Sequence, residues 1–310
     1  MPRFEVHGLA EAIGGAALGD LARPLDAVRA LEDRSPGAIS PRLKRPLLAA
    51  LETPLPGAVL APPELARAAI ERGVPAAIAH DEPLIGLARI IEAFHPEAPA
   101  EGAIHPTAVV DPSARLHPTV RVGPNAVIEA DVAIGEGSLV GPGAVICAGA
   151  VLGRFVRVGP NAVVGHEGFG FVPAAPVPIR IRHVGNAVLE DFVELGAGAC
   201  VDRGTLGSTV IRAGAKLDNL VQVGHNAEVG RGVLIAAQTG LAGSTRIGDG
   251  AMLGGQVGVA DHRSVGPRAR VAGQSGVIGD VGAGEEVAGT PAVPHLRWLR
   301  AMVALTREKK

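Results

Sequence analysis

Aromatic side chains are scarce in this sequence. They make up 2% of its 310 residues, tyrosine is absent and tryptophan occurs once. Hydrophobic residues nevertheless reach 47%, so the core must be built from valine, isoleucine, leucine and alanine. Such side chains suit many small, similar layers better than one bulky centre.

The sequence also lacks an excess of charge, a set of cysteines and a long apolar run. Its formal net charge is -2, which provides no basic field for nucleic acid. Cys147 and Cys200 are the only cysteines, which fits a reducing compartment and gives no disulfide framework. The N-terminus has no signal-peptide core and no stretch is typical of a membrane span. We therefore expect a cytoplasmic protein without stable membrane insertion.

What the sequence does contain is a six-residue repeat. Aliphatic residues recur at every sixth position in three runs, from Ile104 to Val164, from Leu189 to Val201 and from Ile211 to Val277. Gly, Ala or Glu often follows the aliphatic residue, and a small residue often lies four places after it. This period is neither that of a helix nor the alternation of a simple strand.

Six residues of this kind form one short extended piece and one tight turn. Three such units close a triangular coil of roughly 18 residues that buries one aliphatic layer and pairs its backbone with coils ~4.8 Å away. The runs are long enough for roughly eight to nine coils, which gives a prism ~40 Å tall. The sequence thus predicts a mainly β protein that contains a parallel β-helix.

The β-helix is expected to span residues 101–290 and to lie between two other parts. Residues 1–100 lack the period; helices near residues 9–13, 63–70 and 84–94 and strands near 57–60 and 75–79 indicate a small α/β domain. Pro291 and Pro294 end the repeat. In the last segment, 291–310, residues 296–310 predict an amphipathic and mostly basic helix.

Two interruptions break the repeat, and loops that leave a regular scaffold often carry function. The first, residues 165–188, contains Phe169 and Phe171 in a Gly-Phe-Gly-Phe segment. These rings either form a hydrophobic plug over the prism wall or contact a ligand, and the sequence does not decide between the two. The second interruption is a short bulge at residues 202–208.

His225 follows the second interruption and is the strongest candidate for a catalytic side chain. It lies two places after the inward-facing Val223, so its ring is expected to point from the corner toward solvent. One coil further on is Gly243, where a bare backbone can approach a ligand, and about one coil beyond that is His262. The three positions are predicted to line one edge of the prism, with the two histidines ~10 Å apart along its axis.

This arrangement suits the transfer of an acyl group to an amine. A neutral imidazole, with an ordinary pKa of about 6.5, can accept the proton of an attacking amine at neutral pH. The backbone N–H of Gly243 could stabilise the tetrahedral oxyanion. The histidines do not cluster with acids at metal-ligand spacing, so no metal is expected. Cys147 and Cys200 occupy ordinary repeat positions, which favours packing over a role as nucleophile.

The order of these parts resembles the UDP-3-O-acylglucosamine N-acyltransferase family of lipid A biosynthesis over nearly the whole chain. The resemblance rests on the N-terminal domain, the Gly-Phe-Gly-Phe loop, the terminal helix and the segments Val201–Gly204, Asp218–Asn219, Gln222–Asn226 and Gly289–Ala292. It implies a left-handed β-helix and a homotrimer with sites in grooves between neighbouring prisms. It also implies that an acyl carrier protein donates a 3-hydroxyacyl chain to the 2-amine of a UDP-linked 3-O-acylglucosamine. The carrier-protein thioester is the donor substrate, and no cofactor is expected.

The resemblance further assigns roles to single residues. His225 matches the catalytic base of the family, Gly243 its oxyanion donor and His262 a second, supporting histidine. The positions expected to bind substrate are Asp218, Asn219, Gln222, Asn226, Phe169 and Phe171. The basic terminal helix suits an acidic carrier protein, and a solvated helix end is the plainer alternative.

One segment departs from the family pattern. Where the family carries an aromatic residue and an Asn-Pro-Lys-Tyr-like segment that holds the uracil, residues 37–45 of this chain contain neither an aromatic ring nor asparagine. A divergent paralogue that acylates another nucleotide-sugar, or that binds UDP weakly, therefore stays open. So do a sugar O-acyltransferase, an acetyl-CoA-dependent N-acetyltransferase, and a non-catalytic scaffold or sugar-binding module on the same solenoid.

Overall fold

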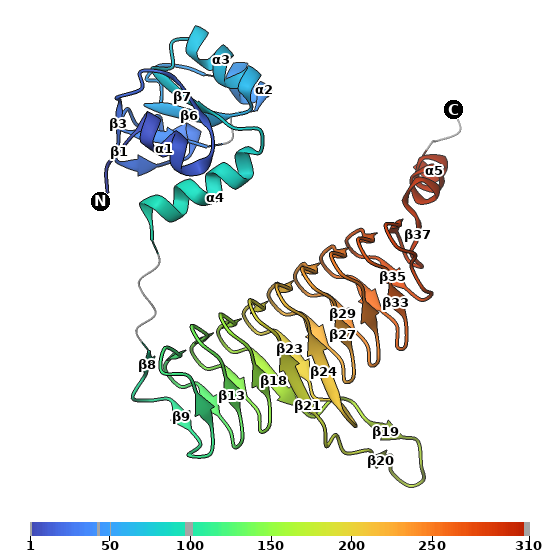
Figure 1. Cartoon of the computed structure of the whole chain (residues 1–310). Coiled ribbons are helices and arrows are strands. Elements are labelled where there is room, and N and C mark those ends of the chain that lie inside the picture. Colours follow the sequence, from blue (N-terminus) through green and yellow to red (C-terminus); the bar gives the residue numbers. More distant parts are fainter. Residues whose placement is uncertain (1, 42–43, 50, 97–101, 307–310) are drawn as a thin grey trace. The chain divides into compact units, whose positions relative to one another are not determined.

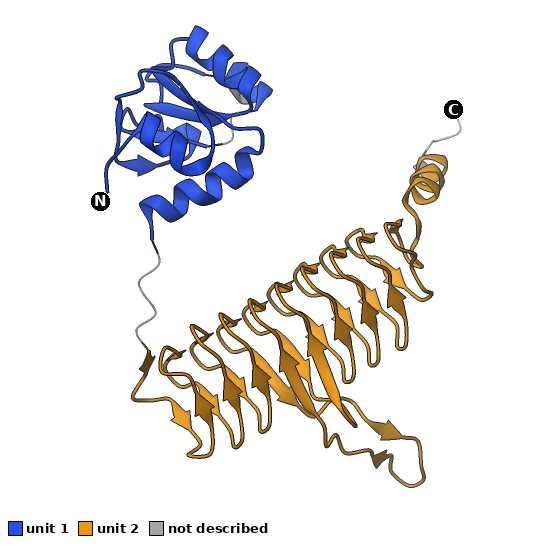
Figure 2. Cartoon of the chain, in the orientation of Figure 1, with its two compact units in different colours: residues 1–99 blue, residues 100–310 orange. Residues whose placement is uncertain are grey.

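The computed structural model describes residues 2–41, 44–49, 51–96 and 102–306 (Figure 1). The chain divides into two compact units, residues 1–99 and residues 100–310 (Figure 2). Each unit has hydrophobic clusters of its own. No described helix combines the length and the apolar character that a membrane crossing requires.

Unit 1 is an α/β domain around a five-stranded sheet, as the sequence predicts. The spatial order of the strands is β2 (Ala16–Gly19), β7 (Ala76–Ala79), β6 (Ala58–Ala61), β5 (Ala38–Ser40) and β4 (Ala27–Val28). Strand β2 is antiparallel to its neighbour and the other pairs are parallel. The remaining elements are β1 (Phe4–Glu5), β3 (Pro24–Leu25), the 3-10 helix Leu31–Asp33, α1 (Val6–Ile13), α2 (Arg45–Ala49), α3 (Pro63–Glu71) and α4 (Pro83–Phe94).

Successive residues of the central strand β6 enter two different hydrophobic clusters. Ala58 and Leu60 belong to the cluster that contains the buried faces of α1 and α4, whereas Val59 and Ala61 belong to the cluster that contains α3. This alternation is the two-residue period of a strand that is covered on both faces. Helices therefore cover both sides of the sheet, and the sheet is buried.

In the described residues, unit 2 is a parallel β-helix whose three faces are sheets of 11, 9 and 8 strands, and only the last strand of the first sheet is antiparallel to its neighbour. The 11-stranded sheet contains β8 (Ala103–Ile104), β11 (Arg121–Val122), β14 (Leu139–Val140), β17 (Arg157–Val158), β22 (Glu194–Leu195), β25 (Lys216–Leu217), β28 (Leu234–Ile235), β31 (Met252–Leu253), β34 (Arg270–Val271), β36 (Glu286–Ala288) and β37 (Val293–Pro294). The 9-stranded sheet contains β9 (Val109–Val110), β12 (Val127–Ile128), β15 (Val145–Ile146), β18 (Val163–His166), β23 (Cys200–Asp202), β26 (Gln222–Val223), β29 (Gly240–Leu241), β32 (Gly258–Val259) and β35 (Gly276–Val277). The 8-stranded sheet contains β10 (Arg115–Leu116), β13 (Ala133–Ile134), β16 (Val151–Leu152), β21 (Asn186–Leu189), β24 (Ser208–Ile211), β27 (Glu228–Val229), β30 (Arg246–Ile247) and β33 (Ser264–Val265).

The coils stack in the register that the repeat predicts. Val122 pairs with Val140 in the next coil, and Ile128 pairs with Ile146. The inward aliphatic positions from Val122 to Val277 are buried and form one continuous cluster. Ile104, in the first coil, is 53% exposed because no described coil covers that end of the prism.

Both interruptions leave the winding of the prism intact. Leu152 of β16 pairs with Leu189 of β21, which in turn pairs with Ile211 of β24. The first interruption forms a hairpin of β19 (Phe171–Val172) and β20 (Ile179–Arg180) that extends away from the coils (Figure 1). Helix α5 (His295–Thr306) confirms the predicted terminal helix, and residues 307–310 of that prediction lie outside the described residues.

Three edges separate the faces of the prism, and each carries different residues. The insertion edge, between the 9- and 8-stranded sheets, carries both interruptions. The glutamine edge, between the 11- and 9-stranded sheets, carries a ladder in which Gln256 donates to Gln238 at 2.7 Å and Gln274 donates to Gln256 at 2.9 Å. The third corner, between the 8- and 11-stranded sheets, is the salt-bridge edge.

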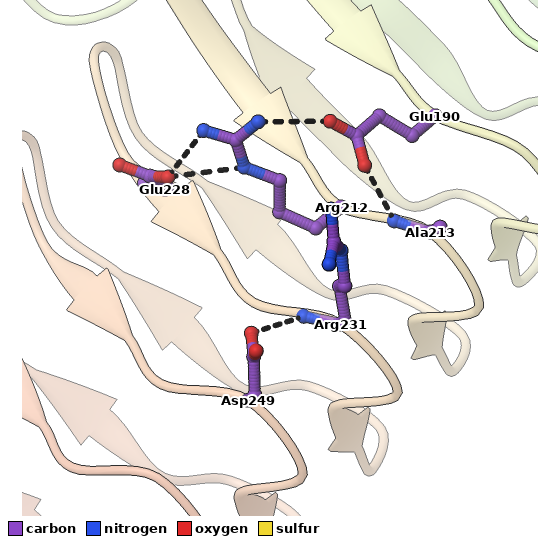
Figure 3. A network of polar contacts seen from close by, with 6 residues as sticks. All are labelled: Glu190, Arg212, Ala213, Glu228, Arg231 and Asp249. Carbon is purple, nitrogen blue, oxygen red and sulfur yellow. Dashed lines mark hydrogen bonds and ion pairs between the residues drawn. The ribbon is translucent and has the colours of Figure 1, made fainter.

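The salt-bridge edge is held by a network of charged groups (Figure 3). The Arg212 guanidinium contacts Oε1 of Glu190 at 2.8 Å and Oε1 of Glu228 at 2.6 Å. The second oxygen of Glu190 accepts the backbone N–H of Ala213 at 3.0 Å. Hydrogen bonds to Glu228 and Glu190 raise the pKa of Arg212. One arginine thus links residues of three successive coils.

Candidate active site

His225 lies on the insertion edge, in the turn between β26 and β27. Gln222 and Val223 of β26 pair with Gly240 and Leu241 of β29, and this register places His225 beside Gly243. A β-carbon at Gly243 would lie 2.6 Å from Nε2 of His225, so only glycine leaves room for the ring.

The backbone N–H of Gly243 is free in the described chain. Its neighbours Ala242 and Ser244 donate their N–H groups to carbonyls of adjacent coils, whereas no acceptor among the described residues takes that of Gly243. A donor that is fixed by the fold and has no partner is suited to stabilise a developing oxyanion.

The other nitrogen of the His225 ring faces the second interruption. Nδ1 lies 3.3 Å from Oγ1 of Thr205 and 3.2 Å from Oδ1 of Asn226. With the proton assigned to Nδ1 and donated to the Asn226 oxygen, Nε2 carries the lone pair on the side of Gly243. The ring is only partly exposed, because His183 packs against it. The sequence predicted a ring that points toward solvent, and in the structure the ring is half-buried.

Asn226 shapes the bulge of the second interruption. Its Oδ1 accepts the N–H of Thr205 at 2.9 Å and its Nδ2 donates to the carbonyl of Leu206 at 2.7 Å. Its backbone N–H donates to Oγ1 of Thr209 at 2.8 Å. Both ends of the amide are thus used inside the chain, and contact of Asn226 with substrate stays a prediction.

His262 lies further along the same edge. Its backbone N–H donates to the carbonyl of Gly243 at 3.0 Å. Its φ of 57° is left-handed, as are those of Asn226 and Ser244 at the equivalent corner of the preceding coils. The side chain is exposed. His225, Gly243 and His262 therefore line one edge, while their chemical roles remain predictions.

The first interruption brings another histidine to this edge, which sequence reasoning did not single out. His183 is 2% exposed, and its ring meets that of His225 edge-on, with centroids 4.9 Å apart and planes at 68°. Neither of its nitrogens has a hydrogen-bond partner within the described chain. Burial, followed by the neighbouring His225, lowers the pKa of His183, so this ring is neutral at neutral pH. An insertion has no repeat register, so spacing could not have located the residue.

The glycines of the Gly-Phe-Gly-Phe segment touch this cluster of side chains. A β-carbon at Gly168 would lie 2.8 Å from Oδ2 of Asp202, and one at Gly170 would lie 2.5 Å from Cε1 of His183. Both positions therefore need a residue without a side chain for the insertion to pack against the edge.

The phenylalanines of the same segment point elsewhere. Phe169 is 83% exposed and Phe171 is 39% exposed, and their rings pack on each other with centroids 5.2 Å apart. The hypothesis of a hydrophobic plug over the prism wall is wrong for the described chain. Contact with a ligand stays a prediction.

Asp202 places a carboxyl group behind the histidines. It ends β23 and pairs with His166 of β18. Burial raises the pKa of Asp202, while a hydrogen bond from Gln222 and the nearby His166, His183 and His225 act in the opposite direction. The net effect is a raised pKa, so this environment favours the neutral carboxyl group although several imidazoles lie nearby.

Asp218 and Asn219 lie on the glutamine edge, not on the insertion edge. Oδ1 of Asp218 accepts the N–H of Asn219, and Oδ1 of Asn219 accepts the N–H of Ala197, each at 2.7 Å. Asp218 also lines a groove of ≈ 910 Å³ along the 11-stranded face. Within one chain, the 9-stranded face, from which Gln222 projects, separates these two residues from His225.

The insertion edge therefore places an imidazole nitrogen beside a free backbone donor. Nε2 of His225 borders the position that a β-carbon of Gly243 would take, so a candidate base adjoins a candidate oxyanion donor. No group of three or more His, Cys, Asp or Glu side chains in the described ranges could hold a metal ion. That the reaction needs no metal or other cofactor stays an expectation.

Comparison with known proteins decides the family. Residues 131–166 match the family model for the bacterial transferase hexapeptide (six repeats). A UDP-3-O-acylglucosamine N-acyltransferase of Granulibacter bethesdensis is 46% identical, with 98% of this chain and 94% of that protein covered. One of Anaeromyxobacter dehalogenans is 39% identical, with 98% and 92% covered. This chain belongs to the UDP-3-O-acylglucosamine N-acyltransferase family. It is an acyltransferase.

Solved structures of other acyltransferases share the fold. The UDP-N-acetylglucosamine acyltransferase from Campylobacter jejuni superposes with a TM-score of 0.57 at 23% identity, over 67% of this chain and 86% of that chain. The one from Francisella novicida has a TM-score of 0.56 at 25% identity, over 64% and 73%. These likenesses confirm the predicted β-helix. The family assignment rests instead on the relatives that match nearly the whole chain.

The segment that departs from the UDP-3-O-acylglucosamine N-acyltransferase pattern, residues 37–45, contains β5 of unit 1 and the residues that follow it. Ser40, its last strand residue, is buried, and its hydroxyl has no partner among the described residues. Ligands of parallel sheets bind at the carboxyl ends of the strands, which is where Ser40 lies. Residues 42–43 are outside the described residues.

Proposed function

We propose that this N-acyltransferase moves a 3-hydroxyacyl chain from an acyl carrier protein to the 2-amine of a UDP-3-O-acylglucosamine, with His225 as general base. The observation that carries the proposal is the position of Nε2 of His225, 2.6 Å from where a β-carbon of Gly243 would lie, beside the unpaired backbone N–H of that glycine. The names of the relatives that match almost the whole chain support the acceptor.

In the proposed reaction, Nε2 of His225 takes a proton from the acceptor amine as the amine nitrogen attacks the thioester carbonyl carbon. A C–N bond forms and the carbonyl π electrons move to the oxygen, which accepts a hydrogen bond from Gly243 N–H. Collapse of this intermediate re-forms C=O and breaks the C–S bond. The imidazolium then returns its proton to the thiolate of the carrier protein, and the base is neutral again.

A homotrimer would bring together candidate residues that one chain keeps apart. His225 lies on the insertion edge, whereas Asp218 lies on the glutamine edge beside the groove of the 11-stranded face. Packing three prisms side by side about a threefold axis is a heterologous contact that closes into a ring. The insertion edge of one subunit would then face the groove of the next, and two subunits would complete each site.

The terminal helix supports an acidic carrier protein as donor. Helix α5 contains Arg297 and Arg300, both exposed, and no acidic residue between His295 and Thr306. A basic helix attracts an acidic partner at long range, and salt screens that attraction. The KM for the acyl carrier protein should therefore rise with ionic strength. A KM that does not depend on salt would favour a solvated helix end instead.

Product analysis tests the proposed function. The full-length protein is incubated with 3-hydroxyacyl carrier protein and either UDP-3-O-acylglucosamine or its analogue with a hydroxyl in place of the 2-amine. We expect an amide from the first acceptor and no product from the second. An ester from the analogue, or no amide from the amine, would contradict the proposal.

The unusual segment at residues 37–45 favours one second candidate, transfer to a different nucleotide-sugar. The absence of an aromatic ring and asparagine there removes base stacking and an amide contact. UDP added to the same assay should inhibit competitively against the acceptor if uridine is recognised. Another nucleoside diphosphate that inhibits better than UDP would support the second candidate.

A further inference from the structure

The ring of His225 is held only loosely by its own polar contacts. The distances from Nδ1 to Thr205 and Asn226, 3.3 and 3.2 Å, are long for hydrogen bonds. The Asn226 oxygen also already accepts the N–H of Thr205 at 2.9 Å. Because the terminal torsion of a histidine has a broad energy profile, these contacts alone leave the ring room to turn. A second restraint is needed to keep Nε2 beside Gly243.

His183 supplies a ring-to-ring contact in addition to these polar contacts. The two imidazoles meet edge-on with centroids 4.9 Å apart, and His183 is 2% exposed. On the insertion itself, Gly170 packs so closely on His183 that a β-carbon there would lie 2.5 Å from Cε1. His183 is thus confined between the Gly-Phe-Gly-Phe turn and His225.

The surroundings of His183 give it no strong polar partner inside the described chain. Both nitrogens are buried and neither forms a hydrogen bond of good geometry. The nearby backbone of Ile181 and the acids Asp202 and Glu167 favour the protonated form. Burial and His225 outweigh them and lower the pKa of His183. A neutral ring without polar partners can restrain the His225 ring through van der Waals packing.

We propose that His183, which lies in the first interruption, is a positioning residue. It holds the base in the orientation that presents Nε2 to Gly243. This inference rests on the proposed role of His225 as base. His183 acts through His225 and not on the reacting atoms, because its ring is buried. The first interruption therefore contributes to catalysis in a way that does not depend on its exposed phenylalanines.

Three variants of the full-length protein test the inference. His183→Ala removes the ring, His183→Phe keeps a ring without nitrogens, and Val184→Ala changes an exposed neighbour on the same insertion. We expect kcat of His183→Ala to fall about tenfold or more while KM for both substrates stays within about twofold, because misplacing a reacting group lowers the rate and not the binding. His183→Phe should recover kcat to within about threefold of wild type and keep the acid limb of the pH–rate profile in place. Val184→Ala should behave as wild type.

Several results would overturn the inference. A wild-type kcat in His183→Ala would show that the ring is not needed. An equal loss in His183→Phe and His183→Ala would show that the nitrogens act, not the shape, and a rise in KM alone would indicate substrate contact. Val193→Ala, which opens a cavity in a regular coil at the salt-bridge edge, controls for lost stability and should lower the melting temperature without lowering kcat of the folded protein.

His225→Ala, assayed beside these variants, separates the two proposals. If His225→Ala is as active as wild type, the assignment of the base fails. If His225→Ala is inactive and His183→Ala is fully active, only the positioning role fails.

Discussion

Two turns of the salt-bridge edge and the turn at Gly243 on the insertion edge have the same form but satisfy one backbone N–H differently. At the salt-bridge edge, the N–H of Ala213 donates to Glu190 and that of Arg231 donates to Asp249 (Figure 3). Gly243 has the same place in its turn on the insertion edge and donates to no described group. These two turns of the salt-bridge edge thus use the N–H group for stability, while the turn at Gly243 keeps its donor free for a ligand.

The pKa values of two carboxyl groups, Glu190 at the salt-bridge edge and Asp202 at the insertion edge, are shifted in opposite directions. Burial alone would raise the pKa of Glu190, but hydrogen bonds from Arg212 and from the Ala213 N–H lower it overall. Burial raises the pKa of Asp202, and its partners do not restore it. The charge of Glu190 is therefore stabilised by its partners, whereas that of Asp202 is disfavoured by burial. Carboxyl groups with raised pKa values are typical of functional sites.

The largest effect on activity should come from adding a β-carbon at Gly243, beside the ring of His225. A β-carbon in Gly243→Ala would lie 2.6 Å from Nε2 and would displace the ring. We expect kcat to fall by about 10²–10³, the usual cost of losing an oxyanion donor or its geometry. Gly279→Ala is the matched control, because a β-carbon there meets nothing within 4 Å. Gly279 lies on the same edge, two coils further on, so equal activity of the two variants would mean that the contact with His225 gives Gly243 no special role.

The next effect concerns the bulge that only the insertion edge carries. Asn226→Ala removes the acceptor for Thr205 N–H and the donor to Leu206. Asn125→Ala is the control, since both asparagines have left-handed φ values, 60° and 57°. We expect Asn226→Ala to lose about 1–2 kcal/mol more unfolding free energy than the control in urea denaturation. Equal losses would mean that the amide does not hold the bulge.

A smaller effect should follow from breaking the network at the salt-bridge edge. Arg212→Met leaves Glu190 and Glu228 without their shared partner. Because these side chains are partly exposed, we expect a loss of about 1 kcal/mol in unfolding free energy and an unchanged kcat. A fall in kcat at full folding would show that this edge also contributes to catalysis.

The smallest effects, below about 1 kcal/mol, should have opposite signs at the two edges. Glu190 has a lowered pKa, so its contribution to stability is complete above the ordinary value of 4.5 and is lost as the pH falls. Asp202 has a raised pKa, so its charge costs stability once the pH rises above 3.8. At about pH 7, Glu190→Gln should lower the melting temperature and Asp202→Asn should raise it. Shifts of the same sign would contradict the comparison.

The regular parts of the molecule could be predicted from the sequence because each hexad fixes one buried position. The stack of His225 and Gly243 follows from that register alone, as does the burial from Val122 to Val277. In unit 1, β6, β7 and the three longer helices were predicted, whereas β2 to β5 and α2 were not, because segments this short show no clear period.

The rest of the site depends on contacts that a register does not encode. His183 reaches His225 from within an insertion, and only the folded chain shows that Gly168 and Gly170 allow this approach. The separation of Asp218 from His225 by a whole face, in contrast, is contained in the register, because one hexad, and so one face, lies between them. Sequence reasoning grouped these residues by motif, and the structure separates them by edge.

The most direct measurement is the single-turnover rate of amide formation by His225→Ala, with the acyl carrier protein and the UDP-acylglucosamine both saturating. If Nε2 of His225 is the proton acceptor, this rate should fall by about 10²–10⁴ relative to wild type. A rate equal to that of wild type would contradict the account, because the insertion edge would then lack the base on which the proposed reaction depends.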